Sequence, residues 1–476
     1  MGWFDSIEHN RWLSAQMQDL VDVARGATVP TGFAHLDAEG RADTQRPVDL
    51  AITARMTYVF SLGTLMGIPG CRRHADHGVR ALTRCFADPV NGGWMTLVGP
   101  EPDAEGHGVP WDGPEEHKSQ FHHAFLILGA AAAAVASRPG AHELLVSALH
   151  DQERHWLRPD GLVADTLGAD HSPLGGPMTL GALVHTVEAY LAAAEATTDP
   201  VWVERAEAMT SFVHDRAAEA DWRLGEYFDE DWNPIPIGTG ASTPPDVTWP
   251  DVRRTYRGSV IGHSMQWARL ALQVRAALRS MGRPQPAYLL EMAQEMFERA
   301  RVDGWRRNGE AGFALTVDRE GFPLETGHLQ WVACEGVCAT VAVRRALLDD
   351  GAGQGDVEHY AHCYRSWLDY LHDHVIAAPG VWVGALDEHN QPVAHVGSSE
   401  PVAAPGREGA TAGTTQVAGP VQAAPSRSDV YHAVQTLLMP RVPLWPPFAS
   451  AVSRGLLDKP AQPPADRHSW NVFTRR

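Results

Sequence analysis

The sequence predicts an all-α protein, an (α/α)6 barrel of about twelve helices with short β-hairpins between helix pairs. Three observations lead to this fold. Apolar residues recur at helical spacing in roughly twelve segments. Six of those segments each carry one polar or charged residue within an apolar run. Short stretches that contain Gly and Trp follow most pairs of segments, as expected for tight turns.

The predicted helices begin at N-cap residues where the chain supplies them. Asp49, Thr179 and Ser428 stand where a side-chain oxygen can cap a helix start. After Asp49, Ile52 and Met56 share one helical face because they lie four residues apart. The predicted helices span residues 6–25, 49–66, 72–87, 118–136, 140–156, 180–196, 200–218, 260–282, 285–303, 330–349, 356–377 and 428–440.

The predicted hairpins are GGWM near 92, DGLV near 160, GEYF near 225, DGW near 303 and GVWV near 380. Because no identity between repeats is visible, an irregular all-helical domain remains the alternative. We predict one catalytic domain over 1–458, interrupted by a disordered insertion at 394–427, and a Pro-rich tail at 459–476. The Pro-rich segment 235–257 is a candidate lid or pocket rim.

Bulk composition narrows the choice of partners. The net charge is −19 without a long basic run, which argues against nucleic acid and anionic membranes. The longest apolar run, 125–136, is too short to span a bilayer. Five cysteines and no signal-like N-terminus predict a cytoplasmic protein with reduced thiols. Homo-oligomerisation stays open.

The six polar positions are the candidate pocket residues. Subtraction of their positions gives separations of 68, 62, 78, 72 and 97 residues, which leaves room for one further helix between neighbours. A charged group on an apolar helix face favours a shared polar site, because unpaired burial is costly. The six residues are Arg55, His123, His185, His263, Glu335 and His432.

The strongest candidate is His432, near a helix start whose positive end should keep the imidazole neutral and able to act as a general base. His263 also stands near a helix start, with Gln266 three residues on along the same face. Trp331 and Glu335 share a face as well, an arrangement suited to holding a sugar. The alternative for His432 is a core residue bonded to a carbonyl, and for Trp331 it is core packing.

The three other polar positions are weaker candidates. A single arginine on a helix usually lies at the surface, with its charged end in solvent. The apolar residues on both sides of Arg55 favour instead a side chain that points into the protein. His123 and His185, each taken alone, favour a structural role.

No metal or cofactor is predicted. His372 and His374, and Cys334 and Cys338, come closest to ligand spacing, but neither pair has further ligands nearby in the sequence. Phosphate-loop, dinucleotide and nucleophile-elbow motifs are missing from the sequence. Histidines, an arginine and a carboxylate indicate proton transfer next to a carbonyl.

Several motifs together resemble the N-acylglucosamine 2-epimerase superfamily, most closely its aldose–ketose isomerase branch of mannose and sulfoquinovose isomerases. They are HNRWL at 9–13, VPTGF at 29–33, ITARM at 52–56, DHGVRAL at 76–82, GGW at 92–94, HAF at 123–125, GH at 262–263, WARLAL at 267–272, SDVYH at 428–432 and PRVPLWPPFASAVSRGLLD at 440–458.

The resemblance implies an (α/α)6 barrel with a monosaccharide pocket and no metal requirement. It implies that His432 moves a proton between C2 and C1 through a cis-enediol, and that His263 assists ring opening as a second acid/base. It places Arg55 on the sugar oxygens. The substrate-holding positions it implies are His185, Trp331 and Glu335.

Three positions depart from the isomerase branch. Ala51 stands where that branch usually has Trp, Gly181 where it has Asn, and Gln266 where it has Glu. A smaller side chain at Ala51 would admit a bulkier sugar, so the sugar stays open between mannose and sulfoquinovose types. The alternatives to an isomerase are a 2-epimerase using the same two histidines, an (α/α)6 glycoside hydrolase with Glu335 and Asp429 as carboxyl groups, and a sugar-binding protein without activity.

Overall fold

The computed structural model describes residues 3–37, 40–111, 117–235, 258–393 and 429–458. Over these ranges the chain forms thirteen α-helices. They are α1 (Ile7–Ala24), α2 (Leu50–Leu65), α3 (Cys71–Arg84), α4 (Gln120–Val135), α5 (Ala141–Asp151), α6 (Leu180–Thr197), α7 (Val201–Glu219), α8 (Ile261–Ser280), α9 (Tyr288–Gly304), α10 (Gln330–Asp349), α11 (Glu358–Tyr370), α12 (Tyr431–Leu438) and α13 (Phe448–Ser453).

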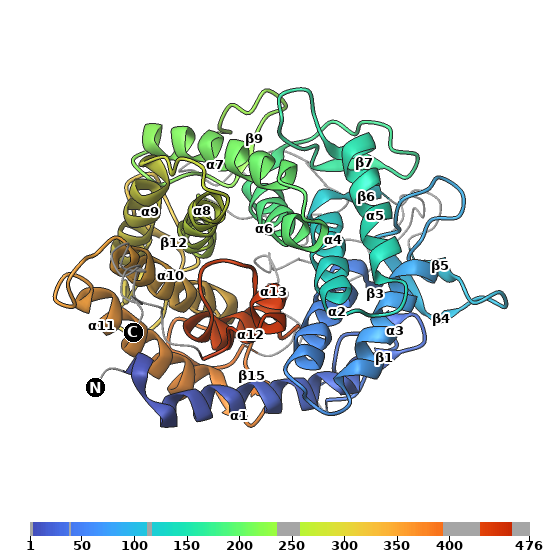
Figure 1. The fold of residues 1–476 in the computed structure, drawn as a ribbon, viewed down its shortest axis with the longest axis horizontal. Helices are drawn as coiled ribbons and strands as arrows, with labels where there is room; N and C mark the ends of the chain where they lie inside the picture. Colours follow the sequence, from blue (N-terminus) through green and yellow to red (C-terminus); the bar gives the residue numbers. More distant parts are fainter. Residues whose placement is uncertain (1–2, 38–39, 112–116, 236–257, 394–428, 459–476) are drawn as a thin grey trace, which may run out of the picture.

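The even-numbered helices α2 to α12 form an inner ring, and the odd-numbered helices α1 to α11 lie outside it (Figure 1). Each inner helix contacts the next, and α12 contacts α2, so the contacts run round the whole circle. Burial separates the two layers: thirteen of the sixteen residues of α2 are buried, against seven of the fourteen of α3. A helix that is apolar on nearly all sides belongs inside, and an amphipathic one covers it.

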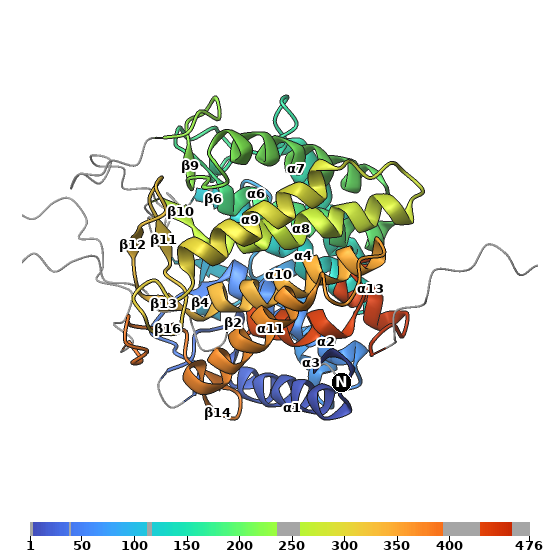
Figure 2. The same ribbon diagram turned by 90° about the vertical axis from the view of Figure 1, so that its left-hand side faces the viewer.

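Short antiparallel strands gather at one end of the ring, and α13 lies toward the other (Figure 2). A strand directly precedes α2, α4, α6, α8 and α10, and it pairs with a strand that follows the next outer helix. The strands that precede inner helices are β3 (Val48–Asp49), β6 (His117–Ser119), β8 (Met178–Thr179), β10 (Ser259–Val260) and β13 (His328–Leu329).

Their partners are β4 (Leu97–Pro102), β7 (Thr166–Gly168), β9 (Tyr227–Phe228), β11 (Thr316–Val317) and β16 (Ala385–Leu386). The remaining strands are β1 (Thr28–Val29), β2 (Gly32–Phe33), β5 (Gly108–Pro110), β12 (Pro323–Glu325), β14 (Ile376–Ala378) and β15 (Val381–Trp382). This pairing brings the N-termini of the inner helices to one end of the ring, which we call the hairpin end.

The predicted all-α class is confirmed, as are two of the helix caps. Asp49 accepts hydrogen bonds from the amides of Ala51 and Ile52, and Thr179 accepts one from Ala182. The predicted turn near 380 is the hairpin β14–β15, whereas GEYF does not form a hairpin of its own and instead supplies β9. In the described residues, no helix is both long and apolar enough to cross a membrane.

Some boundaries differ from the prediction. The helices predicted to reach 156 and 377 end earlier and continue as π-helical turns, Gln152–Trp156 and Leu371–Val375. Helix α13 was not predicted, because it is short and follows a Pro-rich stretch. The predicted cap Ser428, the insertion 394–427, the tail 459–476 and nearly all of 235–257 lie outside the described residues, and the single-domain division stays a prediction.

Inner helices α2 and α4 approach closely at Gly129. A Cβ at this position would lie 2.6 Å from the carbonyl oxygen of Ala54 on α2. That oxygen belongs to the helix backbone and cannot move aside as the end of a side chain can. The contact therefore depends on glycine at 129.

Gly129→Ala should destabilise the protein by about 1–3 kcal/mol, because the added methyl group forces α2 and α4 apart. Helix propensity alone predicts the opposite sign, a gain of about 1 kcal/mol. Denaturant unfolding of the variant against the wild type measures the difference. A higher unfolding midpoint in Gly129→Ala would contradict the close contact.

Candidate active site

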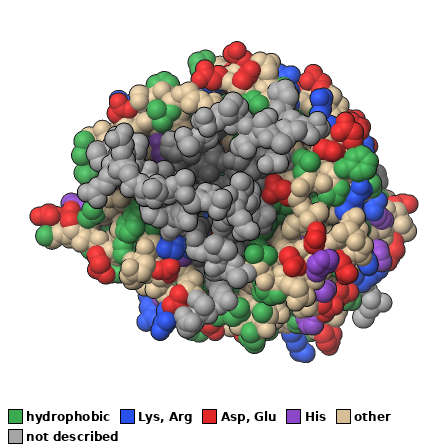
Figure 3. Space-filling model, turned by 180° about the vertical axis from the view of Figure 1, so that it is seen from behind, with side chains coloured by type: hydrophobic (Ala, Val, Ile, Leu, Met, Phe, Trp, Pro, Cys, Tyr) green, Lys and Arg blue, Asp and Glu red, His purple; other side chains and the backbone are tan. Residues whose placement is uncertain are grey.

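The candidate residues come from the first two turns of the inner helices, at the hairpin end. Arg55 lies on α2, His185 on α6, His263 on α8, Glu335 on α10 and His432 on α12, each within six residues of its helix start. A strand pair precedes α2, α6, α8 and α10, so the strand pairs fix where these four helices begin and where their side chains gather. Viewed from this end, acidic and basic side chains intersperse over the described surface (Figure 3).

A carboxylate just before a strand binds His263. Nδ1 of His263 lies 2.7 Å from Oε2 of Glu226, which is 3 % exposed and directly precedes β9. The other oxygen of Glu226 accepts a hydrogen bond of 2.9 Å from the Gly181 amide, at the positive end of α6. A Cβ at Gly181 would lie 3.1 Å from that oxygen, so Glu226 occupies space that a side chain at 181 would need.

His432 is backed by a carboxylate from a neighbouring helix. Its Nδ1 lies 3.0 Å from Oε1 of Glu335, and the Arg269 guanidinium donates two hydrogen bonds of 3.1 and 3.2 Å to the same carboxylate. Burial alone would raise the pKa of Glu335, but Arg269 and His432 lower it below its usual value. The ionised carboxylate carries no hydrogen, so Nδ1 of His432 is the donor and Nε2 is left to exchange a proton.

A fully buried arginine on α8 connects the two neighbouring inner helices, α6 and α10. Arg269 is 0 % exposed and also donates to Glu188 on α6 and to Gln273 one turn along α8. The pKa of the guanidinium is raised well above its usual value, because Glu335 and Glu188 outweigh the effect of burial. Glu188 further accepts hydrogen bonds from the Tyr431 hydroxyl and from the Gln435 amide. Helices α6, α8, α10 and α12 therefore meet at one ionic network.

Arg55 makes an ion pair with Asp429, two residues before the start of α12. The guanidinium carbon lies 3.9 Å from the ring centroid of Phe125, a cation–π arrangement. Two buried atoms of the pair, Nε of Arg55 and Oδ1 of Asp429, have no hydrogen-bond partner among the described residues. Both would suit a polar ligand.

The indole of Trp331 contacts both His263 and His432. The Trp331 ring centroid lies 5.3 Å from that of His263 and 5.7 Å from that of His432. Gln266 approaches Nδ1 of His185 at 3.4 Å, and its own Oε1 has no partner within the described ranges. Burial lowers the pKa of His185 to about 4, although Glu188 acts in the opposite direction. His185 is therefore a neutral hydrogen-bonding group near pH 7.

His123 is the predicted residue that the structure does not bring to this cluster. Its Nε2 lies 3.0 Å from the carbonyl oxygen of Ala148 on α5, and its ring stacks on Trp156. Burial lowers the pKa of His123. This is the structural role that the sequence favours for His123 taken alone.

The sequence prediction missed Glu226, Glu188 and Arg269. Glu188 and Arg269 carry the signal used for the other residues, a charged group within an apolar helical run, but they share helices with residues already selected. Glu226 carries no such signal, because it lies in a short strand connection. His432 is the second residue of α12, earlier than predicted, and Val430 takes the N-cap position.

Neither sequence candidate for metal ligands assembles a site in the described residues. Nδ1 of His372 lies 2.8 Å from a carboxylate oxygen of its exposed neighbour Asp373. Cys334 and Cys338 are buried in the core on α10.

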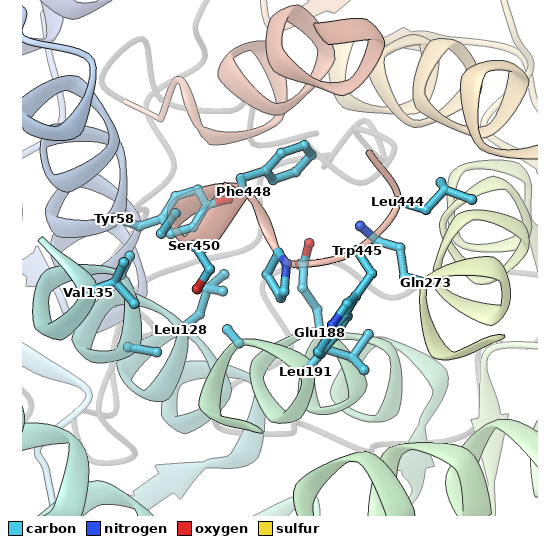
Figure 4. A pocket seen from close by; sticks show the side chains of 15 residues that line it. Tyr58, Leu128, Val135, Glu188, Leu191, Gln273, Leu444, Trp445, Phe448 and Ser450 are labelled. Atoms are coloured by element: carbon cyan, nitrogen blue, oxygen red, sulfur yellow. The ribbon is translucent and has the colours of Figure 1, made fainter. Parts of the chain in front are cut away.

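A pocket lies near α13 (Figure 4). Its lining is mostly apolar, including Leu128, Trp445 and Phe448, and it contains neither His263 nor His432. Glu188 reaches its edge from the ionic network. A sugar needs more polar partners than this lining supplies, so we do not assign substrate binding to it.

A family model described as N-acylglucosamine 2-epimerase (GlcNAc 2-epimerase) matches residues 32–401. The D-mannose isomerase of Thermobifida fusca is 34 % identical over 457 residues, which cover 95 % of this chain and 98 % of the relative. The D-mannose isomerase of Pseudomonas cannabina pv. alisalensis is 30 % identical over 453 residues, which cover 95 % of this chain and 97 % of the relative.

Solved structures share the fold. A crystal structure of D-mannose isomerase aligns with a TM-score of 0.70 at 19 % identity, over 91 % of this chain and 97 % of that chain. Cellobiose 2-epimerase from Spirochaeta thermophila aligns with a TM-score of 0.66 at 20 % identity, over 81 % of this chain and 90 % of that chain. The arrangement of inner and outer helices is therefore the fold of both these structures.

Arg269→Met should destabilise the protein by about 3–5 kcal/mol, because Glu335 and Glu188 would remain buried without their cation. Arg275→Met, on the same helix, is the matched control. It removes a partly exposed pair with Asp350 and should cost less than about 1 kcal/mol. Urea unfolding measures the free energy of unfolding that each variant loses. Equal losses in the two variants would contradict the proposed role of Arg269 in balancing Glu335 and Glu188.

Proposed function

The chain belongs to the N-acylglucosamine 2-epimerase family, and we propose that it is an aldose–ketose isomerase acting on a neutral sugar of mannose type. Two relatives named D-mannose isomerase, similar over nearly the whole chain, support the reaction class. The observation that carries the proposal is the pair of imidazoles, His263 and His432. Each has Nδ1 on a carboxylate, and both contact Trp331.

His432 is the proposed base for the carbon-bound proton. It removes the proton from C2 of the open-chain aldose, and the electron pair of the C–H bond forms the C1–C2 double bond of a cis-enediol. The same imidazole returns the proton to C1, which gives the ketose. Because Glu335 engages Nδ1, the proton travels on Nε2.

His263 is the proposed acid and base for the oxygens. It donates a proton to the ring oxygen as the sugar opens and accepts the proton that O1 releases, and it then assists the transfer of a proton from O2 to O1. Glu226 holds this imidazole as Glu335 holds that of His432. Negative charge that develops on the enediol oxygens lies near the N-termini of the inner helices, where helix dipoles favour it.

The charge of the site favours a neutral substrate. Arg55 is already paired with Asp429, and Arg269 with Glu335 and Glu188. The described part of the site therefore holds more carboxyl groups than guanidinium groups. A sulfonate would have to compete with Asp429 for Arg55, whereas sugar hydroxyls can bind the unpartnered atoms of that ion pair.

The same geometry bears on the alternatives. A hydrolase would need Glu335 or Asp429 as a free carboxyl acid, but each is engaged by an arginine, and the pKa of Glu335 is lowered. A 2-epimerase is the second candidate. It is favoured by the approach of two imidazoles to one indole, since epimerisation needs proton donors on both faces of the enediol.

Proton NMR in D2O with a chelator present tests the reaction. Wild-type enzyme given D-mannose should form D-fructose and exchange the C2 proton for deuterium. His432→Ala should lower kcat/KM by about 10²–10⁴-fold, the usual contribution of a general base. His142→Ala, an exposed histidine on α5, is the control and should keep full activity.

Three outcomes are decisive in that experiment. Ketose formation that depends on His432 supports the isomerase. Formation of the C2 epimer, glucose, would favour the epimerase instead. Mannose that stays unconverted and keeps its C2 proton would contradict the proposed chemistry, and so would full activity in a folded His432→Ala.

Substrate charge is tested by comparing D-mannose with sulfoquinovose. The wild type should prefer D-mannose by at least about tenfold in kcat/KM, and Asp429→Asn should narrow that ratio by releasing Arg55. Asp350→Asn, which neutralises a carboxylate on the surface, should leave the ratio unchanged. Equal turnover of both sugars by the wild type would contradict the charge argument while leaving the isomerase intact.

A further inference from the structure

A second cluster of ligating side chains lies outside the inner ring, where α5 ends. Asp151 is the last residue of α5, and His155 follows it in the π-helical turn. His171 comes from the turn after β7. One ligating atom from each residue lies within 4.8 Å of the others, the only such group of three among the described residues. We propose that Asp151, His155 and His171 bind a zinc ion.

His171 supplies the evidence that the cluster is built for a ligand. Its side chain is 5 % exposed, and Nε2 has no hydrogen-bond partner in the described parts of the chain. That atom faces Oδ1 of Asp151 at 3.6 Å, beyond hydrogen-bond distance.

The neighbours of Asp151 orient its carboxylate toward His171. The Trp156 indole donates a hydrogen bond of 3.0 Å to Oδ2, which leaves Oδ1 for the ion. Lys118, whose charge also acts on His171, is paired with Asp88 at 2.8 Å. Its positive charge is thereby balanced locally.

Glycine at 93 keeps the cluster open. A Cβ there would lie 2.8 Å from Nε2 of His171 and 3.3 Å from Oδ1 of Asp151. Gly93 has φ +67°, a conformation that other residues rarely adopt. The backbone can therefore approach the ligand atoms without filling the space between them.

Two imidazoles and one carboxylate are a ligand set that zinc accepts, with water in the fourth position. Zinc–nitrogen bonds of about 2.0 Å in a tetrahedron place ligand atoms about 3.3 Å apart, so binding would draw the cluster together. The rings of His155 and His171 now stack at 3.8 Å. Parallel rings cannot both direct a lone pair at one ion, so one of the two rings turns on binding.

The ion would connect the end of α5 to the turn after β7, beside Gly93. All three segments lie at the hairpin end, and none belongs to the network around Arg269. The proposed role is structural, and it does not depend on the proposed isomerase activity. Zinc should therefore raise the melting temperature without being required for turnover.

Chelator-treated full-length protein is titrated with Co²⁺ as a spectroscopic probe and with ZnCl2 by calorimetry. The wild type should bind one ion per chain and show the visible absorption of tetrahedral Co²⁺. His171→Ala and His155→Ala should each weaken binding by more than about tenfold, since removal of an outer-shell partner alone costs that much. His372→Ala, an exposed histidine in the other π-helical turn, is the matched control and should bind as the wild type does.

His155→Ala keeps the test valid if His171→Ala does not fold. No binding to the wild type at micromolar ion would overturn the proposal. So would equal binding by the wild type and His155→Ala, because the ion would then be held elsewhere on the chain.

Discussion

The candidate site depends on one buried cation. Arg269 is fully enclosed, and a lone guanidinium in that position would be too costly to bury. The fold meets this requirement with Glu335 from α10 and Glu188 from α6, and Tyr431 and Gln435 on α12 bind Glu188 in turn. The constraint works in both directions. The glutamates make the arginine tolerable, and the arginine fixes where their remaining oxygens point, including the oxygen that engages His432.

The two candidate catalytic histidines are held by different means. His432 is positioned by the ionic network in the core, through Glu335. His263 is positioned from the hairpin end, through Glu226 and the Gly181 amide. This second arrangement fits the glycine at 181. The carboxylate beside His263 comes from the residue before β9 and occupies space that a side chain at 181 would need.

Much of the fold could be predicted from the sequence, because helix formation is largely local. Periodicity and the caps at Asp49 and Thr179 gave the helices within a few residues, while α13 was too short and too close to prolines to be found. The site was harder, because a polar residue in an apolar run can face the pocket or the neighbouring outer helix. His123 faces α5 and binds a carbonyl there. Glu226 joins the site only through the pairing of β8 with β9, which no local pattern reveals.

The claim that carboxylates set the working atom of each histidine can be measured directly. Two-bond proton–nitrogen NMR of protein labelled with ¹⁵N-histidine reports which ring nitrogen carries hydrogen, and His432→Gln assigns the signal. We predict that neutral His432 carries its hydrogen on Nδ1, toward Glu335, and leaves Nε2 unprotonated. A neutral His432 with its hydrogen on Nε2 would contradict the proposed role of Glu335, because this carboxylate could not then orient the base.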